Sequence, residues 1–70
     1  MVDLRLLRFF IAIYEENNIT AAATRCYVSQ PSLSAGLKQL EEELGGALFE
    51  RSKKGVKALD SAHYLYPLAV

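Results

Sequence analysis

Apolar residues recur with helical spacing along most of the chain, and polar or glycine-containing breaks divide it into short elements. The first stretch predicts a helix from about Asp3 to Glu16, with Asp3 as its N-cap. Apolar side chains surround this helix except on a narrow strip formed by Arg5, Arg8, Ala12 and Glu15. Because so broad an apolar surface needs neighbours on more than one side, we expect part of it to contact a partner.

A short second helix follows the break at Asn17-Asn18. Thr20 is its expected N-cap, and the helix is predicted from Ala21 to about Cys26. The run Ala21-Ala22-Ala23 has side chains small enough for another helix to cross closely. Tyr27-Val28 then forms a tight turn before the next helix begins.

The third helix is predicted from Gln30 to Leu44. Ser29 is its expected N-cap, and Pro31 lies in the first turn, where its missing N–H is not needed. Gly45-Gly46 ends the helix. Its predicted buried stripe consists of Leu33, Leu37, Leu40 and Leu44.

Two short strands are predicted next, over residues 47–50 and 56–59, joined by a basic turn in which Gly55 is available for a positive φ. Helical spacing returns from about Ser61, with a bend expected at Pro67, and the chain stops inside this apolar run. We therefore expect a truncated helix at the end. The predicted fold is mainly α: a winged helix-turn-helix of three helices plus a two-stranded β-hairpin wing, followed by the start of a further helix.

The 70 residues make one small domain with a formal net charge of zero, but its charges are unevenly distributed. Four basic residues follow one another without an intervening acid: Arg51, Lys53, Lys54 and Lys57. The acids gather chiefly at 15–16 and 41–43, and we interpret the second group as a solvated helix face. Because a nucleic-acid footprint is a local patch, zero net charge does not exclude this class of partner.

The sequence disfavours several other classes of protein and of functional site. The single cysteine, Cys26, cannot form an intramolecular disulfide, and we interpret it as a small buried apolar residue in a reduced compartment. His63 has no second ligand or acid nearby in sequence, so a surface or interface position is favoured. We find no catalytic constellation, no metal-ligand cluster and no phosphate loop, and therefore predict neither an enzyme nor a cofactor. Without a signal peptide or membrane-spanning run, the expected location is cytoplasmic.

Two helices joined by a short turn are typical of a helix-turn-helix, whose second helix enters the major groove of DNA with its N-terminal end first. The exposed face of the third helix carries residues suited to that position, namely Gln30, Pro31, Ser32, Ser34, Ala35 and Lys38. A glutamine amide can pair with adenine in two directions, and serine hydroxyls can bond to base edges or phosphate. On the hairpin, the three lysines suit phosphates or the minor groove, and Arg51 either joins them or pairs with Glu50 or Asp60.

These motifs together resemble the N-terminal domain of LysR-type transcriptional regulators of bacteria. The resemblance lies in NITAAATRCYVSQPSLS at 18–34, LEEELG at 40–45 and LFER at 48–51. It implies a DNA-binding domain over 1–59, with the helix-turn-helix at 19–38 and the wing at 48–59, and the start of a linker and dimerisation helix at 60–70. The residues it implies on DNA are Thr20, Ser29, Gln30, Pro31, Ser32, Ser34, Ala35, Lys38, Arg51, Lys53, Lys54 and Lys57.

The resemblance also implies assembly. Family members form homodimers through the linker helix, many form tetramers, and a C-terminal domain that is missing here binds a small co-inducer. We expect a homodimer that reads an inverted-repeat operator in double-stranded DNA. The dimer interface predicted from the apolar faces comprises Leu6, Phe9, Ile13, Ala62, Leu65 and Ala69. The alternative is a helical protein-interaction module without DNA binding, which would not need lysines on the wing or bind more weakly as salt rises.

Overall fold

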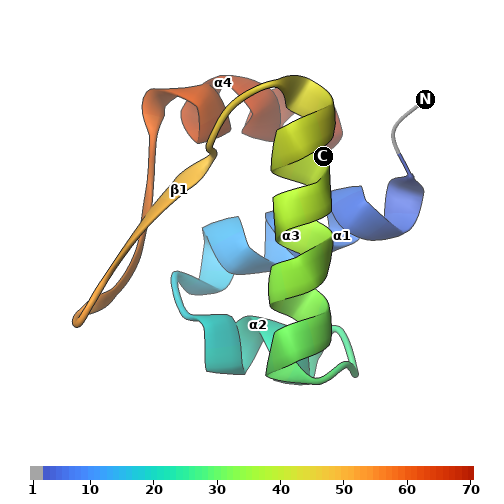
Figure 1. Cartoon of the computed structure of the whole chain (residues 1–70), viewed down its shortest axis with the longest axis vertical. Coiled ribbons are helices and arrows are strands. Elements are labelled where there is room, and N and C mark those ends of the chain that lie inside the picture. The colour runs from blue at the N-terminus through green and yellow to red at the C-terminus, as the bar shows by residue number, and fades with distance from the viewer. Residues whose placement is uncertain (1–2) are drawn as a thin grey trace.

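The computed structural model describes residues 3–70, so residues 1 and 2 of the predicted domain lie outside the described part. The order of elements is α1 (Leu4–Glu16), α2 (Ile19–Arg25), α3 (Gln30–Leu44), β1 (Phe49–Ser52), β2 (Gly55–Ala58) and α4 (Asp60–Ala69). Figure 1 shows α3 crossing in front of α1, α2 lying beneath them, and the hairpin projecting to one side. The predicted mainly α architecture with a two-stranded wing is confirmed.

The core forms where α1 crosses α3. Leu6, Phe10 and Ile13 of α1 are almost completely buried, as are Leu33 and Leu40 of α3. The wing closes one side of this core, because the Phe49 ring lies 5.6 Å from that of Phe10, centroid to centroid. Ala12, which the sequence pattern placed on the polar strip of α1, is only 1% exposed and belongs to the core. The prediction for Ala12 was therefore wrong, since its side of α1 is covered when the domain folds.

The α1–α3 crossing depends on a glycine. A Cβ atom added at Gly36 would lie 2.6 Å from Cδ2 of Phe9 and 3.2 Å from Cδ2 of Leu6. Gly36 is buried in α3, whereas Leu44, predicted on the buried stripe, is 45% exposed. The prediction for Leu44 fails because α1 covers the earlier turns of α3 and does not extend to its last one.

The second helix begins earlier than predicted. Asn18, not Thr20, is the N-cap, and its side chain accepts a 2.8 Å hydrogen bond from the backbone N–H of Ala21. The turn after α2 contains Tyr27 at a φ of 59°, with its side chain 96% exposed. Cys26 is half-buried beside the core, where burial raises the pKa of its thiol.

Both strands of the hairpin lie closer to the turn than predicted, because β1 begins later in the chain and β2 begins earlier. Phe49 pairs with Ala58 and Ser52 with Gly55, so the connection is the two-residue turn Lys53-Lys54. Gly55 adopts a φ of 127°, which confirms its predicted positive φ. The sequence pattern misplaced the strands because Ala47 and Leu48 form the connection from α3 and precede the ladder.

A cluster of aromatic and charged side chains fastens α4 to α1. The rings of Tyr14 and Tyr66 stack with centroids 4.1 Å apart, and the Tyr14 hydroxyl lies 2.9 Å from Nδ1 of His63. The Tyr66 hydroxyl donates a hydrogen bond to the Glu15 carboxylate, which also pairs with Arg25 of α2 at 2.6 Å. The hydrogen bond from Tyr66 and the Arg25 guanidinium lower the pKa of the Glu15 carboxyl. The cluster therefore joins three helices.

The fourth helix continues through Pro67 to Ala69. Ala62 in its first turn is fully buried against the core, and the Ser61 hydroxyl donates to the carbonyl of Ala47 at 2.7 Å. None of the helices formed by residues 3–70 has the length and apolar character needed to cross a membrane.

Candidate nucleic-acid interface

The start of α3 is a capped, exposed helix end. The Ser29 Oγ accepts a 3.2 Å hydrogen bond from the backbone N–H of Ser32 and donates to the Ser32 hydroxyl at 2.9 Å. This capping confirms the predicted helix start. Gln30, Pro31 and Ser32 are all exposed, so their side chains lie where a ligand could reach them. The hydroxyl of Ser29 already makes two hydrogen bonds within the protein.

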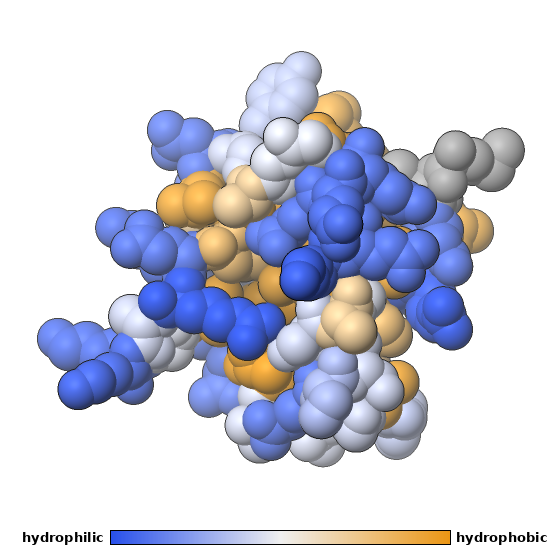
Figure 2. All heavy atoms as spheres, viewed as in Figure 1, coloured by the Kyte–Doolittle hydropathy of each residue, from blue (hydrophilic) through white to orange (hydrophobic). Residues whose placement is uncertain are grey.

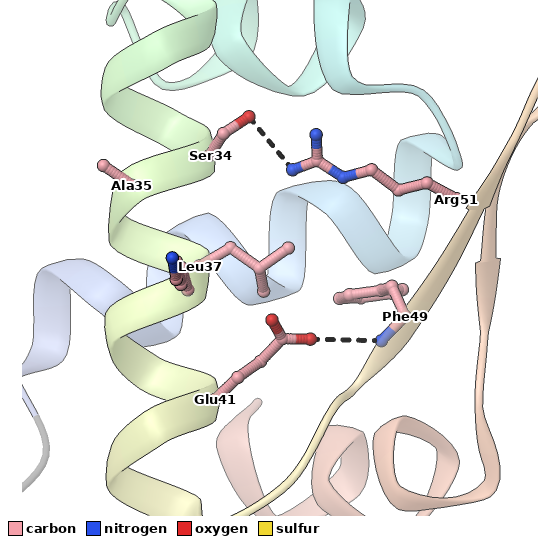
Figure 3. Close-up of a pocket in the computed structure, with 7 residues that line it drawn as sticks. Ser34, Ala35, Leu37, Glu41, Phe49 and Arg51 are labelled. Carbon is pink, nitrogen blue, oxygen red and sulfur yellow. Dashed lines mark hydrogen bonds between the residues drawn. The ribbon is translucent and has the colours of Figure 1, made fainter.

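A groove of about 490 Å³ separates α3 from β1. Lys38 and Ser34 line it from the helix and Arg51 from the strand, above a floor that includes Leu37 and Phe49. Arg51 Nη2 donates a 3.0 Å hydrogen bond to the Ser34 hydroxyl, as Figure 3 shows. Neither of the acidic partners proposed for Arg51 from the sequence holds its side chain in the described part of the chain. Instead, Arg51 connects the wing to the third helix.

The exposed positions of α3 do not all face this groove. Figure 3 shows Ser34 and Glu41 pointing toward the hairpin, while Ala35 points away from it. Ala35 is exposed and lies at the edge of the groove, and together with Ser32 it also borders a second depression between α1 and α3. The predicted DNA-facing set on α3 therefore divides between the free face of the helix and the groove beside the wing.

The wing carries its positive charge at three places: its turn and the two faces of the ladder. Lys53 and Lys54 form the turn, and Figure 2 shows hydrophilic side chains gathered on the projecting tip. Lys57 lies directly opposite Glu50 in the ladder, so both side chains share one face. Arg51 is on the other face because successive residues of a strand point to opposite sides. The tip therefore carries the two lysines that have no acid opposite them in the ladder.

Thr20 lies close to the wing although it is not a helix cap. It is exposed at the start of α2 and lines a depression of about 220 Å³ together with Arg51, Ser52 and Gly55. Its predicted contact with DNA stays a prediction. The N-terminal ends of both α2 and α3 lie at the lower end of the view in Figure 1, on the side to which the wing tip also extends.

The predicted dimer interface needs a correction. Leu6, Phe9, Ile13 and Ala62 are at most 6% exposed within one protomer, so they have almost no surface left for a second copy. The apolar breadth of α1 is explained by its own neighbours, α2, α3 and α4. Leu65 and Ala69 are half-buried against the same core, and their place at an interface stays a prediction.

Sequence reasoning missed the role of Glu41. Its Oε2 accepts hydrogen bonds from the backbone N–H of Leu48 at 2.7 Å and of Phe49 at 3.4 Å. Glu41 was interpreted as part of a solvated face, which describes the exposed Glu42 and Glu43. No local signal identifies this contact, because an acid in a helix and a backbone amide seven residues later are brought together only by the chain reversal at Gly45-Gly46.

With this geometry established, comparison with known proteins identifies the family. The family model described as the bacterial regulatory helix-turn-helix protein of the LysR family matches residues 4–62. The chain belongs to the LysR family. The resemblance recognised in its motifs is thereby confirmed.

Two LysR-type relatives are much longer than the part of them that this chain matches. The HTH-type transcriptional regulator BenM of Acinetobacter baylyi is 42% identical over 69 residues, which are 99% of this chain and 23% of BenM. The HTH-type transcriptional regulator BsdA of Bacillus subtilis is 55% identical over 53 residues, or 76% of this chain and 18% of BsdA. The chain therefore spans about a fifth of the length of these curated relatives.

Solved structures of DNA-binding domains share the fold closely. The CbnR_DBD–DNA complex has a TM-score of 0.92 and 39% identity, covering 96% of this chain and 77% of that one. The complex of BenM_DBD with catB site 1 DNA has a TM-score of 0.90 and 43% identity, covering 96% of this chain and 75% of that one. These likenesses confirm the winged helix-turn-helix fold.

Proposed function

We propose that this LysR-family domain binds double-stranded DNA in a sequence-specific manner. In this proposal the N-terminal half of α3 enters the major groove, and the wing lies on the phosphates or in the minor groove. The observation that carries it is the placement of two surfaces on one side of the molecule: the exposed, capped start of α3 and the lysine-bearing wing tip (Figure 1). The solved structures of CbnR_DBD and BenM_DBD are complexes with DNA, which supports the proposal.

The proposed contact of each side chain with DNA follows from its position in the fold. Gln30 and Ser32, exposed at the tip of α3, are the proposed readers of base edges, since amides and hydroxyls can bond to them. Ala35 on the adjacent turn is small and allows the helix to approach the bases closely. Lys53 and Lys54 at the turn of the wing are the proposed phosphate contacts.

The proposal also includes assembly into a homodimer. Tyr64 and Leu68 lie one helical turn apart on α4 and are 76% and 70% exposed, so they replace the buried α1 residues as the proposed dimer face. A two-fold dimer of this kind would read an inverted repeat. Tetramers and a co-inducer are proposed only for a longer protein of the kind these relatives represent.

The test is fluorescence-anisotropy binding to random duplex DNA across a salt series. We expect the logarithm of the binding constant to fall linearly with the logarithm of salt concentration, by about 0.9 for each phosphate contacted. Lys53→Ala should weaken binding to all sequences alike and make this slope shallower. An unchanged slope would remove Lys53 from the phosphate contacts.

The protein-interaction module remains the competing function. The exposed aromatic and aliphatic side chains on α4, Tyr64 and Leu68, favour an interface of some kind. The same salt series separates the two functions. If the chain is shown to be dimeric and still does not bind duplex DNA at low salt, the protein-interaction module replaces DNA binding as the proposed function.

A further inference from the structure

The base of the wing is held by a set of hydrogen bonds that centre on Glu41. Its side chain accepts from the backbone N–H groups of Leu48 and Phe49, where β1 begins. Its backbone carbonyl accepts from Gly45 at 2.9 Å and from Gly46 at 3.0 Å, which ends α3. One residue of α3 therefore fixes both ends of the connection that leads into the wing.

The second strand returns to the same place. The backbone N–H of Leu59 donates to the carbonyl of Leu48 at 2.9 Å, so the residue held by Glu41 also holds the end of β2. Leu48 and Phe49 are buried, at 2% and 7% exposed, whereas the three residues after Phe49 in β1 are exposed. Hydrogen bonds thus anchor the hairpin at its base. Beyond Phe49 it is held by the hydrogen bond of Arg51 to Ser34 (Figure 3) and by the packing of Val56 and Ala58 of β2 against the core.

Such a hairpin acts as a lever. Four strand residues rise about 3.3 Å each, so the turn at Lys53-Lys54 extends about 13 Å beyond the anchor. A tilt of about 10° at the base would displace the tip by about 2 Å over that length. Because a hydrogen bond to a phosphate tolerates only a few tenths of an ångström, a lysine could keep its contact after such a tilt only by adopting another side-chain conformation.

We propose that Glu41 is a positioning residue for DNA binding, which sets the angle of the wing so that Lys53 and Lys54 reach the phosphates. This inference rests on the proposed function. Glu41 itself touches no DNA in this proposal. It acts through the backbone N–H groups of Leu48 and Phe49. In this proposal the length of the Glu41 side chain matters more than its negative charge.

Two substitutions separate reach from charge. Glu41→Asp keeps the negative charge but shortens the side chain by one methylene, so the carboxylate no longer reaches both N–H groups. Glu41→Gln keeps the length and one acceptor oxygen but removes the charge. Glu42→Asp and Glu42→Gln are matched controls, because the neighbouring Glu42 is exposed and carries the same charge on the same turn.

The readout is the salt slope for random duplex DNA, with a thermal melt of each variant to establish folding. We expect Glu41→Asp to make the slope shallower by about one to two units, the amount lost with one or two phosphate contacts. Glu41→Gln and both Glu42 variants should keep the wild-type slope. A folded Glu41→Asp with the wild-type slope overturns the proposal. If Glu41→Asp does not fold, Glu41→Ala takes its place, because alanine removes both hydrogen bonds and is the best helix former: a shallower slope supports the proposal and a wild-type slope overturns it.

A variant carrying Lys53→Ala and Lys54→Ala distinguishes this inference from the proposed function. If this pair leaves the slope unchanged, the wing does not contact phosphates and the proposed function loses its second surface. If the pair flattens the slope, adding Glu41→Asp should flatten it no further, because the contacts that Glu41 positions are already gone. An additional decrease of the same size would mean that Glu41 acts independently of the wing tip.

Discussion

Gly36→Ala is a sensitive test of how α1 and α3 pack. The new Cβ would lie 2.6 Å and 2.7 Å from two ring carbons of Phe9 and 3.2 Å from Cδ2 of Leu6. Ordinary van der Waals contact begins at 3.4 Å, so the closest approach is too short by 0.8 Å (3.4 minus 2.6). Phe9 is only 6% exposed and Leu6 1%, so neither side chain can move into solvent without disturbing the core.

Two opposing contributions decide the magnitude. Alanine is favoured over glycine inside a helix by about 1 kcal/mol. Overpacking a well-filled core costs about 1–3 kcal/mol. Since the collision involves a buried aromatic ring, we expect the packing cost to exceed the helix gain, with a net loss of up to about 2 kcal/mol. For a domain of this size, that corresponds to a melting temperature lower by up to about 16 °C.

The assay is thermal and urea unfolding followed by circular dichroism, in a double-mutant cycle with Phe9→Leu. Leucine is smaller than the phenylalanine ring, so Gly36→Ala should be neutral or stabilising in the Phe9→Leu background. A rise in melting temperature for Gly36→Ala alone would refute the close crossing, because only the helix-propensity gain would then remain. Equal losses in both backgrounds would assign the cost to a neighbour other than Phe9.

Three further outcomes are expected. Gln30→Ala should cost about 1–3 kcal/mol of affinity on the specific site and much less on random DNA; equal losses in competition titrations would remove Gln30 from base reading. Asn18→Ala should lower the free energy of unfolding by about 1 kcal/mol, whereas Thr20→Ala should change it little, and the reverse order in urea titrations would restore Thr20 as the cap. Because the pKa of Glu15 is lowered in the folded state, its stabilisation is present above its unfolded pKa and is lost as pH falls through the folded pKa. Tyr66→Phe should therefore reduce the loss of stability between neutral and acidic pH, and an unchanged loss in urea titrations at both pH values would exclude the hydrogen bond as its cause.

The amino-acid sequence by itself determined the elements that depend on near neighbours. Ser29 with Pro31 marks the start of α3, and Gly45 marks its end, so the predicted range Gln30–Leu44 agrees with the structure. The positive φ of Gly55 and the N-cap at Asp3 were predicted in the same way. Each signal acts within a few residues, because capping and turn formation satisfy local backbone groups.

Tertiary structure alone decided which of several suitable surfaces is covered and which side chains meet. The periodicity of α3 places Leu44 on the predicted buried stripe, but the position of α1 leaves Leu44 exposed and buries Gly36, which the pattern did not place there. Burial of Leu6, Phe9 and Ile13 within one protomer likewise removes α1 from the predicted dimer face. Glu41 reaches the base of the wing only after the chain has reversed direction. These outcomes depend on residues far apart in the chain becoming neighbours, and the period of apolar residues carries no information about which elements will meet.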